Sequence, residues 1–532
     1  MPQDRRPAPA QPNGDPALDA ADREQLRRRG ISEAGIRRQL ELLRRPPIHT
    51  TLLRHCAPGD GVRILRAHEE AGLLELWRQA AAAERLLKLV PASGAATRMF
   101  GLLRRRAGDK APGSREALRR LAAEGDEAAE SVLRLLDDLP RLPFAEDLER
   151  LLAARGESAA ELARAGAYVP LLDGLLDSRG LGYGASPKAL IPFHRYATGP
   201  RTAFAEHLAE SAQYLTDAAG RCRLHFTISV ADEAAFAAAL EAAREPSNPL
   251  PRVEYEVGFS HQDPATDSVA VEPSGDLARD AEGRLLLRPA GHGALLGNLE
   301  ALGGDLVLVQ NIDNVVPEDR QAEVVRWKRL LVGLAVRLET DLGELRRRLE
   351  AAPADPAVVS EVAAGLARCL ALQPPPGATG EALAAWTGGR LRRPLRVCGV
   401  VPNAGEPGGG PFWVADADGA AGGQIVEPPE VDRQDPGQRR LWQRATHFNP
   451  VNLVLSLRDP EGRPYPLRSF VDETRHLVVG RRHDGRALRA LERPGLWNGS
   501  MAGWNTCFVE LPPATFNPVK SVFDLLRPEH QL

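Results

Sequence analysis

The segment 305–315, DLVLVQNIDNV, limits most strongly what this chain can fold into. It is apolar from Leu306 to Val309 and then turns polar at once, which is typical of a central parallel strand that is buried on both faces. In open α/β sheets, ligands bind beyond the carboxyl ends of such strands. The segment therefore predicts an α/β fold with a site close to Asp313.

Other strands and helices alternate with this segment. The stretches 85–91, 221–230 and 253–259 read as strands, and 232–244 has the apolar spacing of a helix. Alternation of this kind is typical of a parallel or mixed sheet covered by helices.

Changes of pattern along the chain indicate five consecutive stretches. We expect a disordered tail (1–20), an N-terminal helical segment (21–84), an α/β core (85–320) with a helical insertion (101–180), a second helical segment (321–390) and a β-rich C-terminal portion (391–532).

Charge and cysteine content exclude several classes of protein. The chain has 68 Lys+Arg against 71 Asp+Glu, so its formal charge of -3 creates no field that would attract nucleic acid or an anionic membrane. The five cysteines are scattered without a CxxC pair, which favours neither a disulfide framework nor a zinc site. There is no apolar leader at the start and no run of about 18 apolar residues. We therefore expect a soluble cytoplasmic protein.

The loop after the strand at 85–91 has the composition of a phosphate-binding loop. Small residues from Ala92 to Ala96 let backbone N–H groups approach a ligand, and a following helix would add the positive end of its dipole. Arg98 would neutralise the same anion. A purely structural strand-to-helix turn is the alternative interpretation.

Three further segments carry residues suited to phosphate chemistry. Lys188 follows Pro187 and can act as a point charge, His292 lies between two glycines, and Asp313 is a hard oxygen ligand for Mg²⁺. Each also has a structural interpretation, namely a solvated lysine, a glycine turn and an Asx turn.

Taken together and in order, these segments resemble the sugar nucleotidyltransferases of the nucleotide-diphospho-sugar (GT-A-like) fold, particularly the UDP-glucose and UDP-N-acetylhexosamine pyrophosphorylases. The whole chain is similar to a bacterial family known only as a domain of unknown function. The matching residues are the loop from Ala92 to Arg98, Pro187-Lys188-Ala189-Leu190, FSHQ (259–262), Pro289 to Gly293, Asp313-Asn314 and FNPVKSVFDLL (516–526).

The resemblance implies a Rossmann-type mixed sheet and a role for each matching residue. It implies Arg98, Lys188 and Lys520 as catalytic cations, Asp313 as the Mg²⁺ ligand, Ala92, Ser93, Gly94, Ala95, Thr97, Gln262, Gly291 and His292 as nucleotide-binding residues, and Asn311 and Glu427 as sugar-binding residues.

The reaction implied is Mg²⁺-dependent transfer of a nucleotidyl group from a nucleoside triphosphate, with UTP favoured, to a sugar 1-phosphate. Such a transfer needs positioning and charge neutralisation rather than a protein nucleophile. Two alternatives stay open. A GT-A-type glycosyltransferase would want a DxD pair after the strand at 305–309, and a non-catalytic nucleotide or sugar-binding protein would suit the glycine-poor loop.

Overall fold

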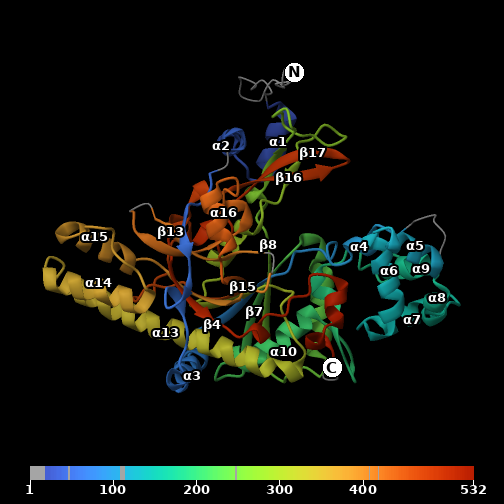
Figure 1. The fold of residues 1–532 in the computed structure, drawn as a ribbon, viewed down its shortest axis with the longest axis horizontal. Helices are drawn as coiled ribbons and strands as arrows, with labels where there is room; N and C mark the ends of the chain where they lie inside the picture. Colours follow the sequence, from blue (N-terminus) through green and yellow to red (C-terminus); the bar gives the residue numbers. More distant parts are fainter. Residues whose placement is uncertain (1–17, 46–47, 108–113, 246–248, 406–407, 417–418) are drawn as a thin grey trace.

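The computed structural model describes residues 18–45, 48–107, 114–245, 249–405, 408–416 and 419–532. The expected disordered tail, residues 1–20, lies outside them except for its last residues, where helix α1 begins at Ala20. The protein is a mixed α/β structure built on one large mixed sheet (Figure 1).

The central sheet has nine strands, and the segment 305–315 supplies one of its inner ones. The strands, in spatial order, are β2 (Ala57–Pro58), β3 (Gly61–Arg63), β18 (Asn505–Glu510), β12 (Leu395–Pro402), β15 (His447–Ser456), β11 (Leu306–Gln310), β4 (Leu86–Pro91), β7 (Arg221–Ile228) and β8 (Glu254–His261). Strand β15 is antiparallel to both of its neighbours, β11 and β12, and the other pairs are parallel. The carboxyl ends of β4, β7, β8 and β11 therefore lie at one edge of the sheet.

This sheet corrects two of the expected boundaries. The expected core ended at residue 320, but β12, β15 and β18 come from the C-terminal portion and extend the same sheet. The segment 21–84 is not wholly helical, because residues 52–63 form β1 (Leu52–His55), β2 and β3, and β3 pairs with β18. Both errors concern pairings between segments far apart in sequence, which periodicity does not reveal.

Long helices cover one face of the sheet. Helices α10 (Ala203–Leu215) and α13 (Gln321–Ala351) pack there, with α13 crossing β12 and β15, and α3 (Ala67–Ala82) packs on α13 (Figure 1). Helix α13 lies so close to α3 that a Cβ atom on Gly333 would lie 2.0 Å from the carbonyl oxygen of Leu73. Beyond α13 follow α14 (Pro356–Leu370) and α15 (Gly380–Leu391).

A helical insertion and an upper lobe extend from the sheet (Figure 1). The insertion consists of α4 (Gly101–Arg104), α5 (Arg115–Ala123), α6 (Glu127–Asp138), α7 (Ala145–Ala153), α8 (Ala159–Ala165) and α9 (Tyr168–Leu176). The upper lobe consists of α1 (Ala20–Arg28), α2 (Glu33–Arg44), β9 (Ser268–Val271), β10 (Leu287–Arg288), β16 (Leu477–His483) and β17 (Arg486–Glu492).

The remaining elements are short. A three-stranded sheet joins β1, β13 (Gly410–Ala415) and β14 (Ala421–Val426), and β5 (Pro192–Tyr196) pairs with β6 (Gly199–Thr202). The other helices are α11 (Glu233–Arg244), α12 (Leu296–Ala301) and α16 (Pro436–Gln443). No helix in the described part of the chain combines the length and the apolarity needed to cross a membrane.

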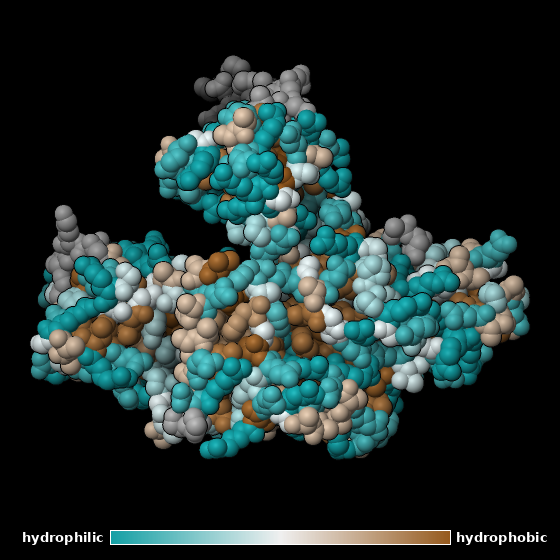
Figure 2. Space-filling model, turned by 180° about the vertical axis from the view of Figure 1, so that it is seen from behind, coloured by the Kyte–Doolittle hydropathy of each residue, from teal (hydrophilic) through white to brown (hydrophobic). Residues whose placement is uncertain are grey.

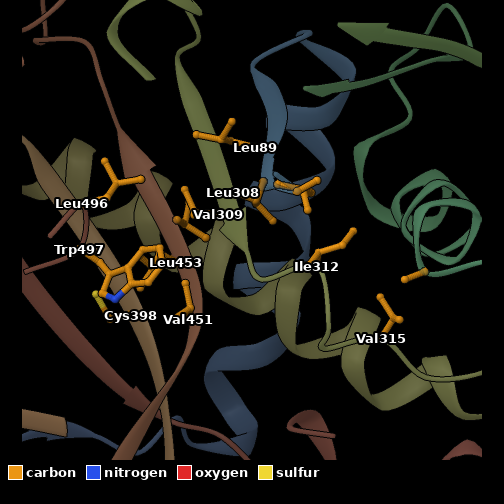
Figure 3. Close-up of a cluster of buried hydrophobic side chains, with 14 of the residues drawn as sticks. Leu89, Leu308, Val309, Ile312, Val315, Cys398, Val451, Leu453, Leu496 and Trp497 are labelled. Atoms are coloured by element: carbon orange, nitrogen blue, oxygen red, sulfur yellow. The ribbon is translucent and has the colours of Figure 1, made fainter. Parts of the chain in front are cut away.

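Apolar side chains from β4, β11, β12 and β15 fill the core beneath the sheet edge (Figure 3). Leu89 and Val309 are neighbours in the register of β4 and β11, and Leu453 on β15 lies opposite Val309. Ile312 continues from the end of β11, so the chain leaves this core directly into the segment that carries Asp313.

Candidate active site

Asp313 lies just beyond the carboxyl end of β11 and binds two lysines. Lys188 Nζ is 2.8 Å from Asp313 Oδ2, and Lys520 Nζ is 3.1 Å from the same oxygen. The side chains of Asp313 and Lys188 are only 11% and 14% exposed, whereas that of Lys520 is 55% exposed. Three residues predicted from distant parts of the sequence therefore meet at one carboxylate.

Electrostatics keep this carboxylate ionised. Burial raises the pKa of Asp313, but the charges and hydrogen bonds of Lys188 and Lys520 outweigh burial and hold the pKa below its usual range. Burial lowers the pKa of Lys188 more than the charge of Asp313 raises it. With both lysines protonated, the three groups carry one excess positive charge, which favours an anionic ligand.

Backbone pairing brings Lys520 to the site. Val519 N–H donates to the carbonyl oxygen of Asp313 at 3.0 Å, and Asn517 N–H donates to Asn314 Oδ1 at 2.8 Å. Asp524 Oδ2 accepts a hydrogen bond from the N–H group of Lys520. The C-terminal segment is thus fastened to the segment after β11 just before Lys520, and Asp524 fixes the Lys520 backbone from within the C-terminal segment.

The predicted phosphate loop lies beside the same residues. Lys188 N–H donates to the carbonyl oxygen of Gly94 at 3.0 Å, and Ala96 N–H donates to that of Ser186 at 2.9 Å. Ser93, Gly94 and Ala95 are exposed, and their N–H groups have no acceptor among the described residues. A Cβ atom on Gly94 would meet nothing within 4 Å, so the space over the loop is open although the loop contains a single glycine.

Two expectations for this loop need correction. Ala92 is fully buried and its N–H group donates to the carbonyl oxygen of Thr227 at 2.8 Å, so it cannot donate to a phosphate. The expectation that a helix follows the loop and adds its dipole is also wrong. Ala96 to Phe100 form turns, and the next helix, α4, has only four residues. The loop therefore offers free N–H groups without support from a helix.

Arg98 and Thr97 are exposed on this loop. The side chain of Arg98 has no hydrogen-bond or ion-pair partner among the described residues, and its neighbour Met99 accepts a hydrogen bond from Val522 N–H at 3.1 Å. The backbone of Arg98 therefore lies next to the segment that carries Lys520.

The predicted base-binding residues lie farther along the same sheet edge. Gln262 follows β8, where its Nε2 group donates to Thr266 and Asp267 at 3.2 Å. Gly291 has φ +76°, a conformation that favours glycine, and precedes His292. His292 stacks on Trp497 with ring centroids 4.1 Å apart, and burial lowers its pKa to about 4.

No hydrogen bond among the described residues joins the two predicted sugar-binding residues, Asn311 and Glu427. Asn311 lies between β11 and Asp313, and its half-buried side chain has no hydrogen bond among the described residues. Glu427 instead joins the group around Trp497, whose Nε1 donates to Glu427 Oε1 at 3.3 Å. Burial raises the pKa of Glu427.

The donor set fits a Mg²⁺ ion that is shared with a substrate. Asp313 Oδ1 is buried and has no hydrogen-bond partner among the described residues, so one hard oxygen is left for a metal. No group of three or more His, Cys, Asp or Glu side chains suited to a metal occurs in the described ranges. Mg²⁺ is commonly held by one or two carboxylates together with substrate phosphates, which is what this site can provide.

An open notch lies over this sheet edge. Figure 2 shows it between the upper lobe and the helical insertion, seen from behind. The chain after β4 passes into the insertion, and the chain after β8 passes into the upper lobe.

Sequence reasoning missed a buried polar cluster beneath this edge. It contains Lys88, Lys328 and Glu210, which lie between the sheet and helices α10 and α13. One signal was available: the sequence has only five lysines among its 68 cationic residues, and the four within the described ranges all bind either Asp313 or Glu210.

Fold and site together define a mixed α/β protein whose sheet edge presents two lysines around one buried aspartate. The chain belongs to the family described as Domain of unknown function (DUF4301), whose model matches residues 19–531. This confirms the membership expected from the sequence.

No curated protein matches the sequence. Among solved structures, a uridine diphosphate N-acetylglucosamine pyrophosphorylase from Trypanosoma brucei is 13% identical with a TM-score of 0.47, over 96% of this chain and 79% of that chain. A UDP-glucose pyrophosphorylase mutant from Leishmania major, solved with UDP-glucose, is 13% identical with a TM-score of 0.43 over the same shares. Because these scores are below 0.5, the function of this protein has to be argued from its own side chains.

Proposed function

We propose that this protein is a sugar nucleotidyltransferase with a GT-A-like fold. It would transfer a nucleotidyl group from a nucleoside triphosphate, with UTP favoured, to a sugar 1-phosphate and release pyrophosphate. The observation that carries the proposal is the arrangement at Asp313, where Lys188 and Lys520 share one carboxylate oxygen while the other is buried and free.

The reaction brings two anions together, so its barrier falls through charge neutralisation and positioning. An oxygen of the sugar 1-phosphate attacks the α-phosphorus, the bond from that phosphorus to the bridging oxygen of the β-phosphate breaks, and pyrophosphate leaves. Lys188 and Lys520 neutralise phosphate oxygens, and the N–H groups of Ser93, Gly94 and Ala95 orient the triphosphate. Arg98, exposed on the same loop, adds a further cation.

Asp313 Oδ1 would hold Mg²⁺. When bound, the ion supplies charge neutralisation between phosphate groups and needs no further protein ligand. Gln262, Gly291 and His292 would face the base, and Asn311 and Glu427 the sugar. Glu427 is suited to this role because its half-buried carboxyl lies beside Trp497.

Incubation of the purified protein with UTP, a panel of sugar 1-phosphates and Mg²⁺ tests the proposal. Release of pyrophosphate, with formation of a nucleotide sugar, supports it. Transfer of sugar from a nucleotide sugar without pyrophosphate release would instead indicate a glycosyltransferase, and nucleotide binding without turnover would indicate a non-catalytic binding protein.

Two variants assign any activity to this site. Lys188→Met should lower pyrophosphate release by about a hundredfold or more, because it removes a charge that acts in the transition state. Arg119→Met is the matched control, since it removes an exposed cation from α5 in the insertion. Equal activity of both variants would contradict the assignment.

A further inference from the structure

Helix α10 turns a polar stripe toward the core. His207, Glu210, Ser211 and Tyr214 are spaced three and four residues apart, so they share one face of the helix. All four are buried, with exposed fractions of 0 to 1%. Burying polar groups in this way costs free energy unless they are paired, so the stripe needs an explanation beyond packing.

The stripe binds two buried lysines. Lys88 Nζ on β4 is 3.0 Å from Glu210 Oε1, and Lys328 Nζ on α13 donates to the same oxygen. Tyr214 OH also donates to it, at 3.0 Å. Burial lowers the pKa of Lys328 to about 7 against the opposing charge of Glu210. One carboxylate thus organises two ammonium groups inside the protein.

Lys328 links this cluster to the strand that leads to Asp313. Its Nζ group donates to Gln310 Oε1, and Gln310 Nε2 donates to the carbonyl oxygen of Asn314 at 2.6 Å. Gln310 is the last residue of β11 and is 2% exposed. Its side chain therefore lies beneath the segment that follows it, which contains Asp313.

The backbone carbonyl groups of every second residue in that segment, 312, 314 and 316, are each bound by a buried side chain. His207 Nε2 lies 3.2 Å from the carbonyl oxygen of Ile312, Gln310 Nε2 binds that of Asn314, and Gln321 Nε2 donates to that of Val316 at 3.1 Å. Burial and the charge of Lys88 lower the pKa of His207 far below its usual range. A neutral His207 can donate through Nε2, so all three carbonyl groups can receive a side-chain donor.

We propose that the buried pair of Glu210 and Lys328 is a positioning platform that acts through Gln310 to fix the Asp313 segment, whereas Lys88 is only a second counter-charge of Glu210. The platform also sets Lys520, because Asn314 and Asp313 bind the backbone of the C-terminal segment at Asn517 and Val519. The kinetic part of this inference rests on the proposed function, whereas its structural part does not.

Two lysine variants, one inside the platform and one outside it, form a matched pair. Lys328→Met and Lys88→Met each remove one buried ammonium and leave Glu210 paired with the other, so neither leaves an unpaired charge. Only Lys328→Met breaks the link to Gln310. Gln310→Met breaks that link without changing the charge, and it serves as the second variant if Lys328→Met does not fold.

Hydrogen exchange of the Asn517 and Val519 amides, measured by mass spectrometry of fragments, is the deciding readout. We expect Lys328→Met and Gln310→Met to speed this exchange about tenfold, and Lys88→Met to leave it close to the wild-type rate. The same two variants should lower kcat for pyrophosphate release about tenfold with little change in KM, since they misplace groups used in the transition state.

Equal exchange in Lys328→Met and Lys88→Met would overturn the proposal and make the cluster ordinary core structure. If the wild-type protein releases no pyrophosphate, the proposed function fails, yet the exchange rates still decide whether the platform holds the segment. Faster exchange in Lys328→Met and Gln310→Met, but not in Lys88→Met, supports the platform whether or not the protein releases pyrophosphate.

Discussion

The pair of Lys188 and Asp313 gives the most informative single test, because it separates stability from catalysis. Asp313→Asn keeps the shape of the side chain and removes its charge. Lys188 is then left largely buried without the carboxylate that binds it, and breaking a buried pair from one side costs about 3–5 kcal/mol. Lys520 is more than half exposed, so losing its contact adds only about 0.2–1 kcal/mol.

The double variant Asp313→Asn/Lys188→Met removes both buried charges. It should recover most of the lost stability, since replacing both members of a buried pair by neutral groups is often neutral. Turnover should behave differently. Both the single and the double variant should lose about a hundredfold or more of pyrophosphate release, because neither has the metal ligand.

Scanning calorimetry and a pyrophosphate assay measure the two effects. We expect the Tm of Asp313→Asn to fall by several degrees and that of the double variant to return toward the wild type. If the double variant is no more stable than Asp313→Asn, the loss of stability does not come from the unpaired charge of Lys188, and the reasoning is refuted. Unchanged pyrophosphate release by Asp313→Asn would refute the metal role.

Two further predictions rest on the same contacts, and a third rests on the packing of two helix glycines. Lys520→Met should lower turnover about a hundredfold in the pyrophosphate assay yet change the free energy of unfolding by less than about 1 kcal/mol, because the side chain is half exposed. The folded pKa of Asp313 lies below its unfolded value, so its ionised form stabilises the fold above the ordinary aspartate pKa of about 3.9, and this contribution is lost as pH falls through the lowered pKa. Calorimetry of the wild type and Asp313→Asn should therefore show Tm values that converge in acid and differ most near neutrality. Gly333→Ala should lower Tm strongly, since its Cβ would lie 2.0 Å from the carbonyl oxygen of Leu73, whereas Gly389→Ala on α15, which meets nothing within 4 Å, should raise Tm slightly.

The meeting of the main site residues could be predicted from sequence because it follows from sheet geometry. Carboxyl ends of parallel strands share an edge, so the loop after β4 and the segment after β11 had to approach each other once both strands were recognised. Lys520 was different. Its place depends on backbone pairing between Val519 and Asp313, and only the resemblance to a known family pointed to it.

The features that could not be predicted from sequence depend on which hydrogen-bond partner each polar group has in the folded protein. The small residue Ala92 looked like its neighbours in sequence, but it still lies within reach of β7, which takes its N–H group. The pairing of β3 with β18 joins opposite ends of the chain and leaves no periodic signal. The stripe on α10 was overlooked because polar residues at helical spacing are ordinarily assigned to solvent.

Two carboxylates in this protein each bind two lysines, and exposure separates their roles. Around Glu210 every charged group is almost wholly buried, so no ligand can neutralise the excess positive charge, and burial lowers the pKa values of both lysines instead. Around Asp313 the same excess charge reaches solvent through Lys520. An anion that binds there is attracted by both lysine ammonium groups, and its binding requires no further charged side chain of the protein to become buried. The same chemical grouping can therefore hold a segment in place at one position and bind phosphate at the other.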